Sequence, residues 1–137
     1  MTRNYEGSPL LDGDVNITKA MKECEISRFI TLATPSVKFE KDKKSFLTIV
    51  PGIMVRLLFL KAYKEIIATG EIVKSSGLDW TIVRILAPKN MIATDNVKVS
   101  FGDHKIGFSI SREDIAAFML SQTAEKQYIH SMPIIGS

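Results

Sequence analysis

Few residues of this sequence combine the type and the spacing that chemistry requires. His104 and His130 lie far apart, and neither has a second histidine or a carboxylate at metal-ligand spacing, so we expect no metal site. Cys24 is the single cysteine; it can form no internal disulfide, and we expect it to pack near a helix end rather than react. The remaining candidates are two short loops, Ala33-Thr34-Pro35-Ser36 and Leu86-Ala87-Pro88, each following an apolar stretch.

These two loops could bind a ligand if the apolar stretches are neighbouring strands. In an open parallel sheet, ligands bind beyond the carboxyl ends of the strands, near the point where strand order reverses. The small residues at 33–36 would let a flat ring lie close to the backbone. The alternative is that both segments are ordinary loops, because Thr-Pro and Ala-Pro pairs commonly end strands.

The strands that must position these loops are visible as short apolar runs. Residues 29–33 are apolar nearly throughout, which is typical of a strand covered on both faces, and residues 80–86 follow the same pattern. Two shorter candidates, 97–101 and 105–110, flank Gly102-Asp103 and predict a β-hairpin. Residues 127–132 predict a last short strand.

Helix signals alternate with these strands. Asp12 or Asp14 can cap a first helix, and a long helix is predicted from about residue 53 to residue 75, with Gly70 as a point where it bends or splits. Ser111 and Asp114 have the spacing of a capping box at the start of a third helix. Strands alternating with helices predict a mostly parallel α/β sheet with flanking helices, in a single domain spanning 1–137.

Three further features lead to expectations about packing. Trp80 enters its strand at the amino end, away from the candidate ligand, and should belong to the core. Arg84 is a charge at the end of an apolar strand and needs a partner, for which we expect Glu113 or Asp114. The charged segment 38–44 is interpreted as a solvated loop.

Composition excludes several classes of protein. The chain has 137 residues, 45% hydrophobic and 24% charged, with a net charge of +3, which is globular composition. Its positive residues are scattered among carboxylates, which argues against nucleic-acid binding. No apolar signal segment opens the chain, and the longest apolar run, 46–60, contains Pro51 and Arg56 and is too short to span a membrane. We expect a cytoplasmic protein whose apolar run packs against a sheet or a partner, with a membrane surface as the alternative.

Four segments of the sequence, in this order and spacing, resemble a known family of proteins. RFITLATPS, a helix, SGLDWTIVR, then SREDIAAFML, from about residue 15 to the end, resembles the C-terminal portion of the atypical short-chain dehydrogenase/reductase superfamily, in particular its NAD(P)H-binding and NmrA-like members. The resemblance implies part of a Rossmann fold and a nicotinamide dinucleotide, NAD or NADP, as cofactor. It also implies that Ala33, Thr34, Pro35 and Ser36 lie beside this cofactor and that Ile85, Leu86, Ala87 and Pro88 approach its nicotinamide. Family members often have proline where this chain has Ile85.

The same resemblance suggests two catalytic candidates. Many short-chain dehydrogenases use Tyr-x-x-x-Lys, in which the lysine lowers the tyrosine pKa for proton transfer. Tyr63 is a candidate, but Ile67 occupies the lysine position, so packing is the alternative role. Ser36 could stand near a substrate carbonyl or simply cap a turn. Glu71 matches an acidic position of relatives, and we expect a structural role in a salt bridge.

The largest departure from the resemblance concerns the front of the chain. The family begins with a strand and a glycine-rich turn that holds the pyrophosphate, whereas Gly7 and Gly13 are isolated here. The first strands are expected to be missing, as in a truncated product, a fragment or a half whose partner is another chain. We predict an NAD(P)H-binding oxidoreductase. The alternative is a non-catalytic NmrA-like regulatory or interaction module, and we expect assembly through the open edge of strand 29–33 or through the surface of residues 46–60.

Overall fold

The computed structural model describes residues 7–137, apart from the side chain of Val55. The expected lack of a signal segment therefore falls partly outside the described residues. The elements in chain order are α1 (Pro9–Glu23), β1 (Arg28–Ala33), α2 (Phe46–Leu58), α3 (Leu60–Ser75), β2 (Asp79–Arg84), β3 (Ala87–Lys89), β4 (Lys98–Ser100), β5 (Ser109–Ser111), α4 (Arg112–Ser121) and β6 (Ile134–Gly136).

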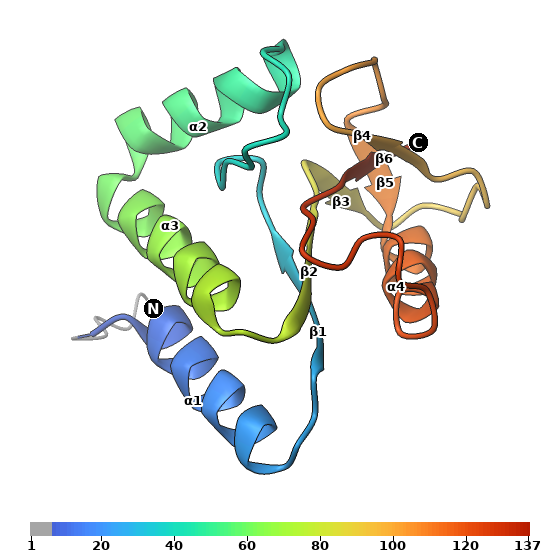
Figure 1. The fold of residues 1–137 in the computed structure, drawn as a ribbon. Helices are drawn as coiled ribbons and strands as arrows, with labels where there is room; N and C mark the ends of the chain where they lie inside the picture. Colours follow the sequence, from blue (N-terminus) through green and yellow to red (C-terminus); the bar gives the residue numbers. More distant parts are fainter. Residues whose placement is uncertain (1–6) are drawn as a thin grey trace.

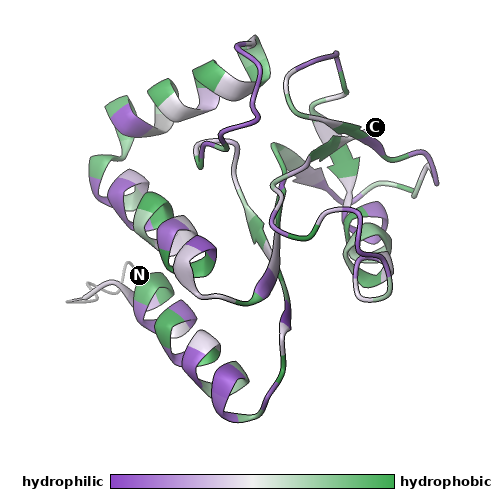
Figure 2. Cartoon of the chain, in the orientation of Figure 1, coloured by the Kyte–Doolittle hydropathy of each residue, from purple (hydrophilic) through white to green (hydrophobic). Residues whose placement is uncertain are grey.

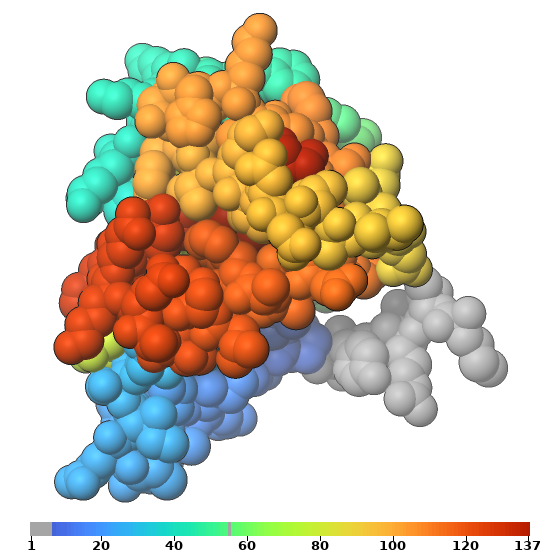
Figure 3. Space-filling view, turned by 90° about the vertical axis from the view of Figure 1, so that its right-hand side faces the viewer, coloured from blue at the N-terminus to red at the C-terminus, as the bar shows by residue number. Residues whose placement is uncertain are grey.

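The main sheet has the strand order β1-β2-β6-β4. β1 pairs with β2 and β2 with β6 in parallel, whereas β4 is antiparallel to β6; β3 and β5 form a separate parallel pair. α1, α2 and α3 lie on one side of this sheet and α4 lies on the other (Figure 1). The face that carries α4 also carries the segment around residues 87–97 (Figure 3). The predicted mostly parallel α/β sheet with flanking helices is confirmed.

Side chains of β1 and β2 alternate between two apolar clusters, one on each face of the sheet. On the α3 side, Trp80 and Ile82 pack with Val73 and with Val37 of the loop after β1. On the α4 side, Val83 packs with residues of β5, α4 and β6. Trp80 is only 7% exposed, which confirms its expected place in the core. Burial on both faces explains why the middle of β2, from Trp80 to Val83, contains no charged residue.

Gly70 does not bend its helix, contrary to the prediction. α3 is continuous through this position, and the long helix is divided instead at Phe59, between α2 and α3. A Cβ added to Gly70 would lie 2.7 Å from Cγ1 of Val37. Glycine is therefore used here for close packing of α3 on the loop after β1.

The helical segment also begins earlier than predicted, at Phe46 rather than near residue 53. Thr48 Oγ1 accepts a hydrogen bond from the Ser45 backbone N–H, and the carbonyl of Ser45 accepts from the N–H of Thr48 and of Ile49. These bonds form the first turn before Pro51 is reached. Pro51 therefore lies inside α2, in the turn after the one that Ser45 and Thr48 begin. Most of α2 is hydrophobic around its circumference (Figure 2).

Two strand predictions are wrong. Residues 97–101 and 105–110 do not pair as a hairpin, because β4 pairs with β6 and β5 pairs with β3. The Gly102-Asp103 turn exists, yet the chain leaving it crosses to another strand. Residues 127–132 form turns with a single bridge from Ser131 to Thr81, and the last strand is instead β6.

Both ends of α1 differ from expectation. The helix begins at Pro9 with Ser8 at the N-cap position, so Asp12 and Asp14 lie inside the helix rather than capping it. Pro9 at the first helical position explains this start, since its missing N–H costs nothing there. Cys24, expected to pack, is exposed beyond the last turn.

Candidate functional site at the ends of β1 and β2

The two loops singled out in the sequence are neighbours in space. Ala33 and Arg84 are partners in the register of β1 and β2, and the backbone N–H of Ile85 donates to the carbonyl of Ala33 at 3.0 Å. The carboxyl ends of two adjacent parallel strands therefore meet at one edge of the sheet. This is the position at which open α/β sheets bind ligands.

A cavity of about 370 Å³ opens beside these strand ends, between β1, α1 and α3. Its lining is mostly apolar: Leu10 and Asp14 come from α1, Ile66, Thr69, Gly70 and Val73 from α3, and Thr31, Leu32, Ala33, Thr34, Val37, Ile82 and Ile85 from the strands and the loop after β1. For scale, a dry cavity of about 150 Å³ takes up benzene. The space is therefore large enough for a flat ring.

The structure divides the eight residues expected to contact a cofactor into two groups. Ala33, Thr34 and Ile85 line the cavity. The other five do not: Pro35 and Ser36 are buried, Leu86 packs against the cluster of Leu47, Ile106 and Ile134, and Ala87 and Pro88 pair with β5 as part of β3. Cofactor contact by all eight stays a prediction, and the geometry favours the three that line the cavity.

Three hydroxyl groups near the cavity have no hydrogen-bond partner within the described structure. They belong to Thr34, Ser36 and Thr69. Two of them, Thr34 and Thr69, are among the residues that line the cavity. Burial of a hydroxyl without a hydrogen-bond partner costs free energy, and these three oxygens are themselves closed to solvent. A ligand group that reached them and hydrogen-bonded to them would recover that cost. Thr69 was not singled out in the sequence, although its spacing from Ile66 and Val73 on a helix is consistent with a shared face.

The cavity holds one carboxyl group and no cationic side chain among its lining residues. Burial raises the pKa of the Asp14 carboxyl above its ordinary value. An apolar space with a carboxyl group suits an uncharged ring and disfavours a phosphate. The residues present therefore fit the nicotinamide end of a dinucleotide, whereas a glycine-rich turn able to hold its pyrophosphate is not found among residues 7–137.

Arg84 holds the loop after β1 in place, but not through the partner expected. Its guanidinium is fully buried and forms two hydrogen bonds of 2.6 Å with the carboxylate of Asp42. It also donates to the carbonyls of Val37 and Met132 at 3.1 and 2.8 Å. The predicted partner Asp114 instead accepts from Thr94 and Asp95, and the backbone N–H of Thr94 is the main cause of its lowered pKa.

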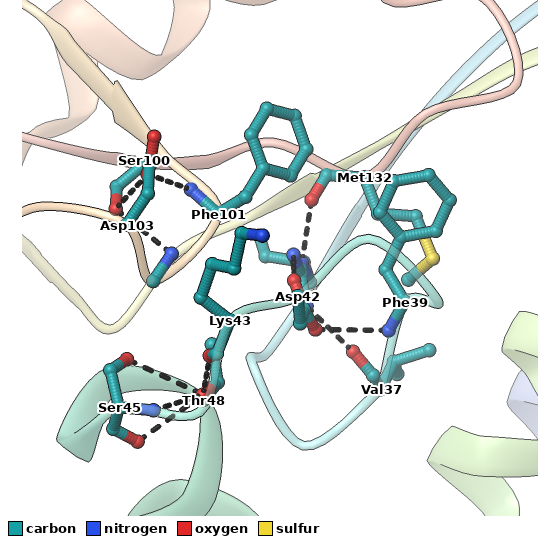
Figure 4. Close-up of polar contacts among 12 residues, drawn as sticks. Val37, Phe39, Asp42, Lys43, Ser45, Thr48, Ser100, Phe101, Asp103 and Met132 are labelled. Atoms are coloured by element: carbon teal, nitrogen blue, oxygen red, sulfur yellow. Dashed lines mark hydrogen bonds and ion pairs between the residues drawn. The ribbon is translucent and has the colours of Figure 1, made fainter.

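Segment 38–44 is accordingly not the freely solvated loop that its charge suggested. Asp42 also accepts from the backbone N–H of Phe39 at 3.0 Å, and the N–H of Lys43 donates to the carbonyl of Phe101 at 2.7 Å (Figure 4). Gly102 has φ +86°, and a Cβ there would lie 2.5 Å from the Lys43 carbonyl oxygen. Glycine is thus required at 102 both by conformation and by the approach of this loop.

The structure places Tyr63, Ser36 and Glu71 in three different environments. Tyr63 is half-buried on α3 and is not among the residues that line the cavity, which favours its packing role. Ser36 is fully buried. Glu71 forms a surface salt bridge with Lys74, in agreement with the structural role expected for it.

The positions of the other candidate residues follow from the same geometry. His130 Nε2 lies 3.0 Å from the Leu78 carbonyl oxygen, and its ring packs against Trp80. Over residues 7–137, no group of three potential metal ligands comes together. Within the same range, no helix is both long and apolar enough to cross a membrane.

Comparison with known proteins supports the class that this geometry defines. The chain is similar to a solved protein from Bacillus halodurans described as a putative NAD-dependent epimerase/dehydratase, with 20% identity and a TM-score of 0.74 over 99% of this chain and 60% of that one. It is also similar to an oxidoreductase from Lactococcus lactis, with 19% identity and a TM-score of 0.68 over 98% of this chain and 58% of that one. A short-chain dehydrogenase/reductase from Veillonella parvula, solved in complex with NADP, matches at 17% identity and TM-score 0.70, over 96% of this chain and 60% of that one. No curated protein sequence matches. The chain thus has a Rossmann-like α/β fold and spans about 60% of the length of these structures.

The sequence profile of the NAD(P)H-binding family matches residues 4–126. This match covers most of the chain, and the protein therefore belongs to the NAD(P)H-binding family. The resemblance inferred from SGLDWTIVR and the elements around it is confirmed.

Proposed function

We propose that this chain provides the nicotinamide end of an NAD(P)H site and acts in an oxidoreductase of the atypical short-chain type. The bound nicotinamide would supply the hydride chemistry. The chain itself would hold the ring in the cavity beside Ala33, Thr34 and Ile85 and exclude water from it. A cytoplasmic setting, in which reduced nicotinamide cofactors are abundant, is part of this proposal.

The observation that carries the proposal is the adjacency of the two strand ends. The bond between Ile85 and Ala33 fixes the edge of the cavity, and the buried ion pair of Arg84 with Asp42 holds the loop that follows. The free hydroxyls of Thr34 and Thr69 are suited to the carboxamide of a nicotinamide, which both donates and accepts hydrogen bonds.

The experiment is a titration of the chain with NADPH and NADH, followed by calorimetry and by cofactor fluorescence. Micromolar binding is expected if the strand ends form a working site, and the preferred dinucleotide would separate NADP from NAD. The variant Thr34→Val keeps the shape of the side chain but removes its hydroxyl. It should weaken binding by roughly threefold to tenfold, the loss expected for one hydrogen bond.

The matched control is Thr123→Val, because Thr123 is exposed after α4 and far from the cavity in sequence and fold. Its affinity for NADPH should equal that of the parent chain. Absence of binding at millimolar NADPH, or equal affinities for Thr34→Val and the parent, would refute the proposed site.

A second candidate function is supported by a separate observation. α2, the joining residue and the first residue of α3 expose eight large apolar side chains: Phe46, Ile49, Ile53, Met54, Leu57, Leu58, Phe59 and Leu60. Contiguous apolar patches of this kind mark interaction surfaces. A regulatory or interaction module of the NmrA-like type, which self-associates through this surface, is therefore the alternative to an oxidoreductase.

A further inference from the structure

A recess of about 150 Å³ lies between the loop after β1 and the first turn of α2. Its lining includes three lysines of the loop and two residues of α2: Lys38, Lys43, Lys44, Thr48 and Ile49. We call it the lysine recess, and it shares no lining residue with the cavity beside β1. The N–H of Lys43 donates to the carbonyl of Phe101, directly after β4, so this loop reaches the end of the strand order opposite β1.

The lining of the lysine recess is strongly positive. None of the ion pairs formed within residues 7–137 involves Lys38, Lys43 or Lys44. Among the described residues that line the recess, Asp42 has the one carboxyl group, and both of its oxygens are engaged by the buried guanidinium of Arg84. The first turn of α2 contains no acidic residue, so the partial positive charge of the helix N-terminus adds to that of the lysines. An anion in this recess would therefore meet three ammonium groups and one carboxylate that is already neutralised.

The backbone that carries these lysines is held by buried groups. Thr48 is only 6% exposed, and its Oγ1 donates to the carbonyl of Lys43 at 2.7 Å (Figure 4). On the other side, the N–H of Lys43 donates to the carbonyl of Phe101 at 2.7 Å, and Asp42 is fixed by Arg84. The lysine side chains thus leave from a fixed backbone, which lowers the entropy lost when they bind an anion.

We propose that the lysine recess binds a phosphate monoester. Lysine is a compact point charge that suits a phosphate dianion, whereas a planar carboxylate is best matched by the paired donors of arginine, which is not among the described lining residues. A water molecule takes up about 30 Å³ of liquid, so the recess is a few water volumes in size and admits a phosphate group but not a whole nucleotide. The rest of the ligand therefore extends over the exposed surface.

The shape of the recess also separates this ligand from a nucleic acid. A nucleic acid presents a row of phosphates and is bound by cations spread along that row. Here three lysines line a single recess, which suits one phosphate group. Two kinds of molecule carry such a group, namely a small soluble ester and a lipid with a phosphate monoester headgroup, and the test distinguishes them.

The test is a titration of the ¹⁵N-labelled chain with inorganic phosphate and with glycerol phosphate, followed by NMR at constant ionic strength. The backbone amides of residues 43–49 should shift and saturate, with one phosphate per chain, and an equal ionic strength of chloride should not shift them. Sedimentation with phosphatidylcholine vesicles, with and without phosphatidic acid, shows whether a lipid headgroup is also bound. Saturable binding of either source supports the recess as a phosphate site. Shifts that do not saturate, or that spread over the exposed lysines of the whole chain, would mean an adventitious ion only and would overturn the proposal.

A charge-neutralised variant tests the role of the lysines. Lys43→Gln/Lys44→Gln should weaken phosphate binding by roughly tenfold or more, the loss expected for hydrogen bonds to charged groups. The matched control, Lys22→Gln/Lys126→Gln, removes the same net charge at exposed positions outside the recess and should leave the affinity unchanged. Equal affinities of the two double variants would overturn the proposal.

A second variant places a negative charge in the recess without removing a lysine. Ile49→Glu adds a carboxylate at a 42% exposed lining position, so it should abolish phosphate binding and leave the circular dichroism spectrum unchanged. Ile53→Glu, one helical turn further along α2 and 51% exposed, is the matched control and should bind phosphate nearly as well as the parent chain. Full phosphate affinity in Ile49→Glu would show that the anion binds elsewhere.

Discussion

Arg84 and Asp42 form a two-pronged ion pair, in which the two terminal guanidinium nitrogens each lie 2.6 Å from one carboxylate oxygen. The pair joins the end of β2 to the loop after β1 across 42 positions of sequence. Because the guanidinium also donates to the carbonyls of Val37 and Met132, a single side chain connects three segments that border the strand ends. The positions of the segments around the candidate site therefore depend on the buried guanidinium of Arg84.

Removing Asp42 should destabilise the fold strongly. The variant Asp42→Ala leaves the guanidinium of Arg84 buried without its counter-charge, a change that typically costs about 3–5 kcal/mol. Urea denaturation followed by Trp80 fluorescence measures the free energy of unfolding. Glu40→Ala, an exposed carboxylate in the same loop, is the control and should change it by less than about 0.5 kcal/mol. A loss below about 1 kcal/mol for Asp42→Ala would show that the pair is not a main support of the loop.

Gly70→Ala tests the close packing of α3 on the loop after β1. The added methyl would meet Val37 at 2.7 Å, so we expect a loss of about 1–3 kcal/mol of unfolding free energy. Gly13→Ala is a matched control, because nothing lies within 4 Å of a Cβ at this helical position. Alanine there should stabilise by up to about 1 kcal/mol through helix propensity. Equal effects of the two substitutions would contradict the packing argument.

Asp103 should make stability depend on acid pH. The backbone N–H of Phe101, together with His104 and Ser100, lowers the pKa of this carboxyl to about 2. Because the pKa is lower in the folded state, the stabilisation is complete above the unfolded value, near 3.8, and is lost as the pH falls toward 2. The drop in unfolding free energy between these two pH values should be smaller in Asp103→Asn. Parallel pH profiles for the two proteins would be evidence against this assignment.

Thr69→Val should separate stability from binding. The valine keeps the volume of the side chain and removes a buried hydroxyl that has no partner in the described structure, so the fold should gain roughly 1 kcal/mol. If that hydroxyl contacts the nicotinamide, the affinity for NADPH should fall at the same time. Thermal unfolding and calorimetric titration of one variant give both values. A gain in stability with unchanged affinity would place Thr69 outside the cofactor contacts.

The apolar side of α2 should govern self-association. The double variant Ile53→Glu/Leu57→Glu puts two charges on exposed positions and should leave the circular dichroism spectrum and the unfolding free energy nearly unchanged. Light scattering at micromolar concentration should then give a lower mass than for the parent chain. A parent chain that is already monomeric would count against the interaction role of this surface.

Elements whose signals are local were predicted well. β1 and β2 were visible as apolar runs, and Ser111 does accept the backbone N–H of Asp114 at the start of α4, as the capping spacing predicted. The strand ends at Ala33 and Ile85 were also predicted to face the ligand edge, and the structure makes them neighbours.

Features that depend on distant pairing were not predicted. Gly102 and Asp103 indicated a hairpin because the residues that favour a turn are local in sequence. The strand that pairs with β4 is β6, which lies more than 30 residues further along the chain and cannot be identified from the turn. Asp42 was assigned to a solvated loop because neither its neighbours nor its spacing reveal a buried arginine as its partner. The sequence predicted the residues at the strand ends that line the cavity, but not Thr69 and Asp14. These two line the cavity only because of the way α3 and α1 pack against each other.

The parallel pairing of β1 with β2 has a consequence for how the chain reaches this structure. Arg28 must find Asp79 across 51 positions, and parallel strands cannot form through a tight turn. The central pairing therefore waits for closure of a long loop, which slows folding relative to proteins with local contacts. Until the sheet has formed, Leu47 of α2 lacks its core partners Ile106 and Ile134, while most large apolar side chains of α2 are exposed even in the folded chain. We expect slow refolding with a strong tendency to aggregate, and prompt capture of the nascent chain by chaperones.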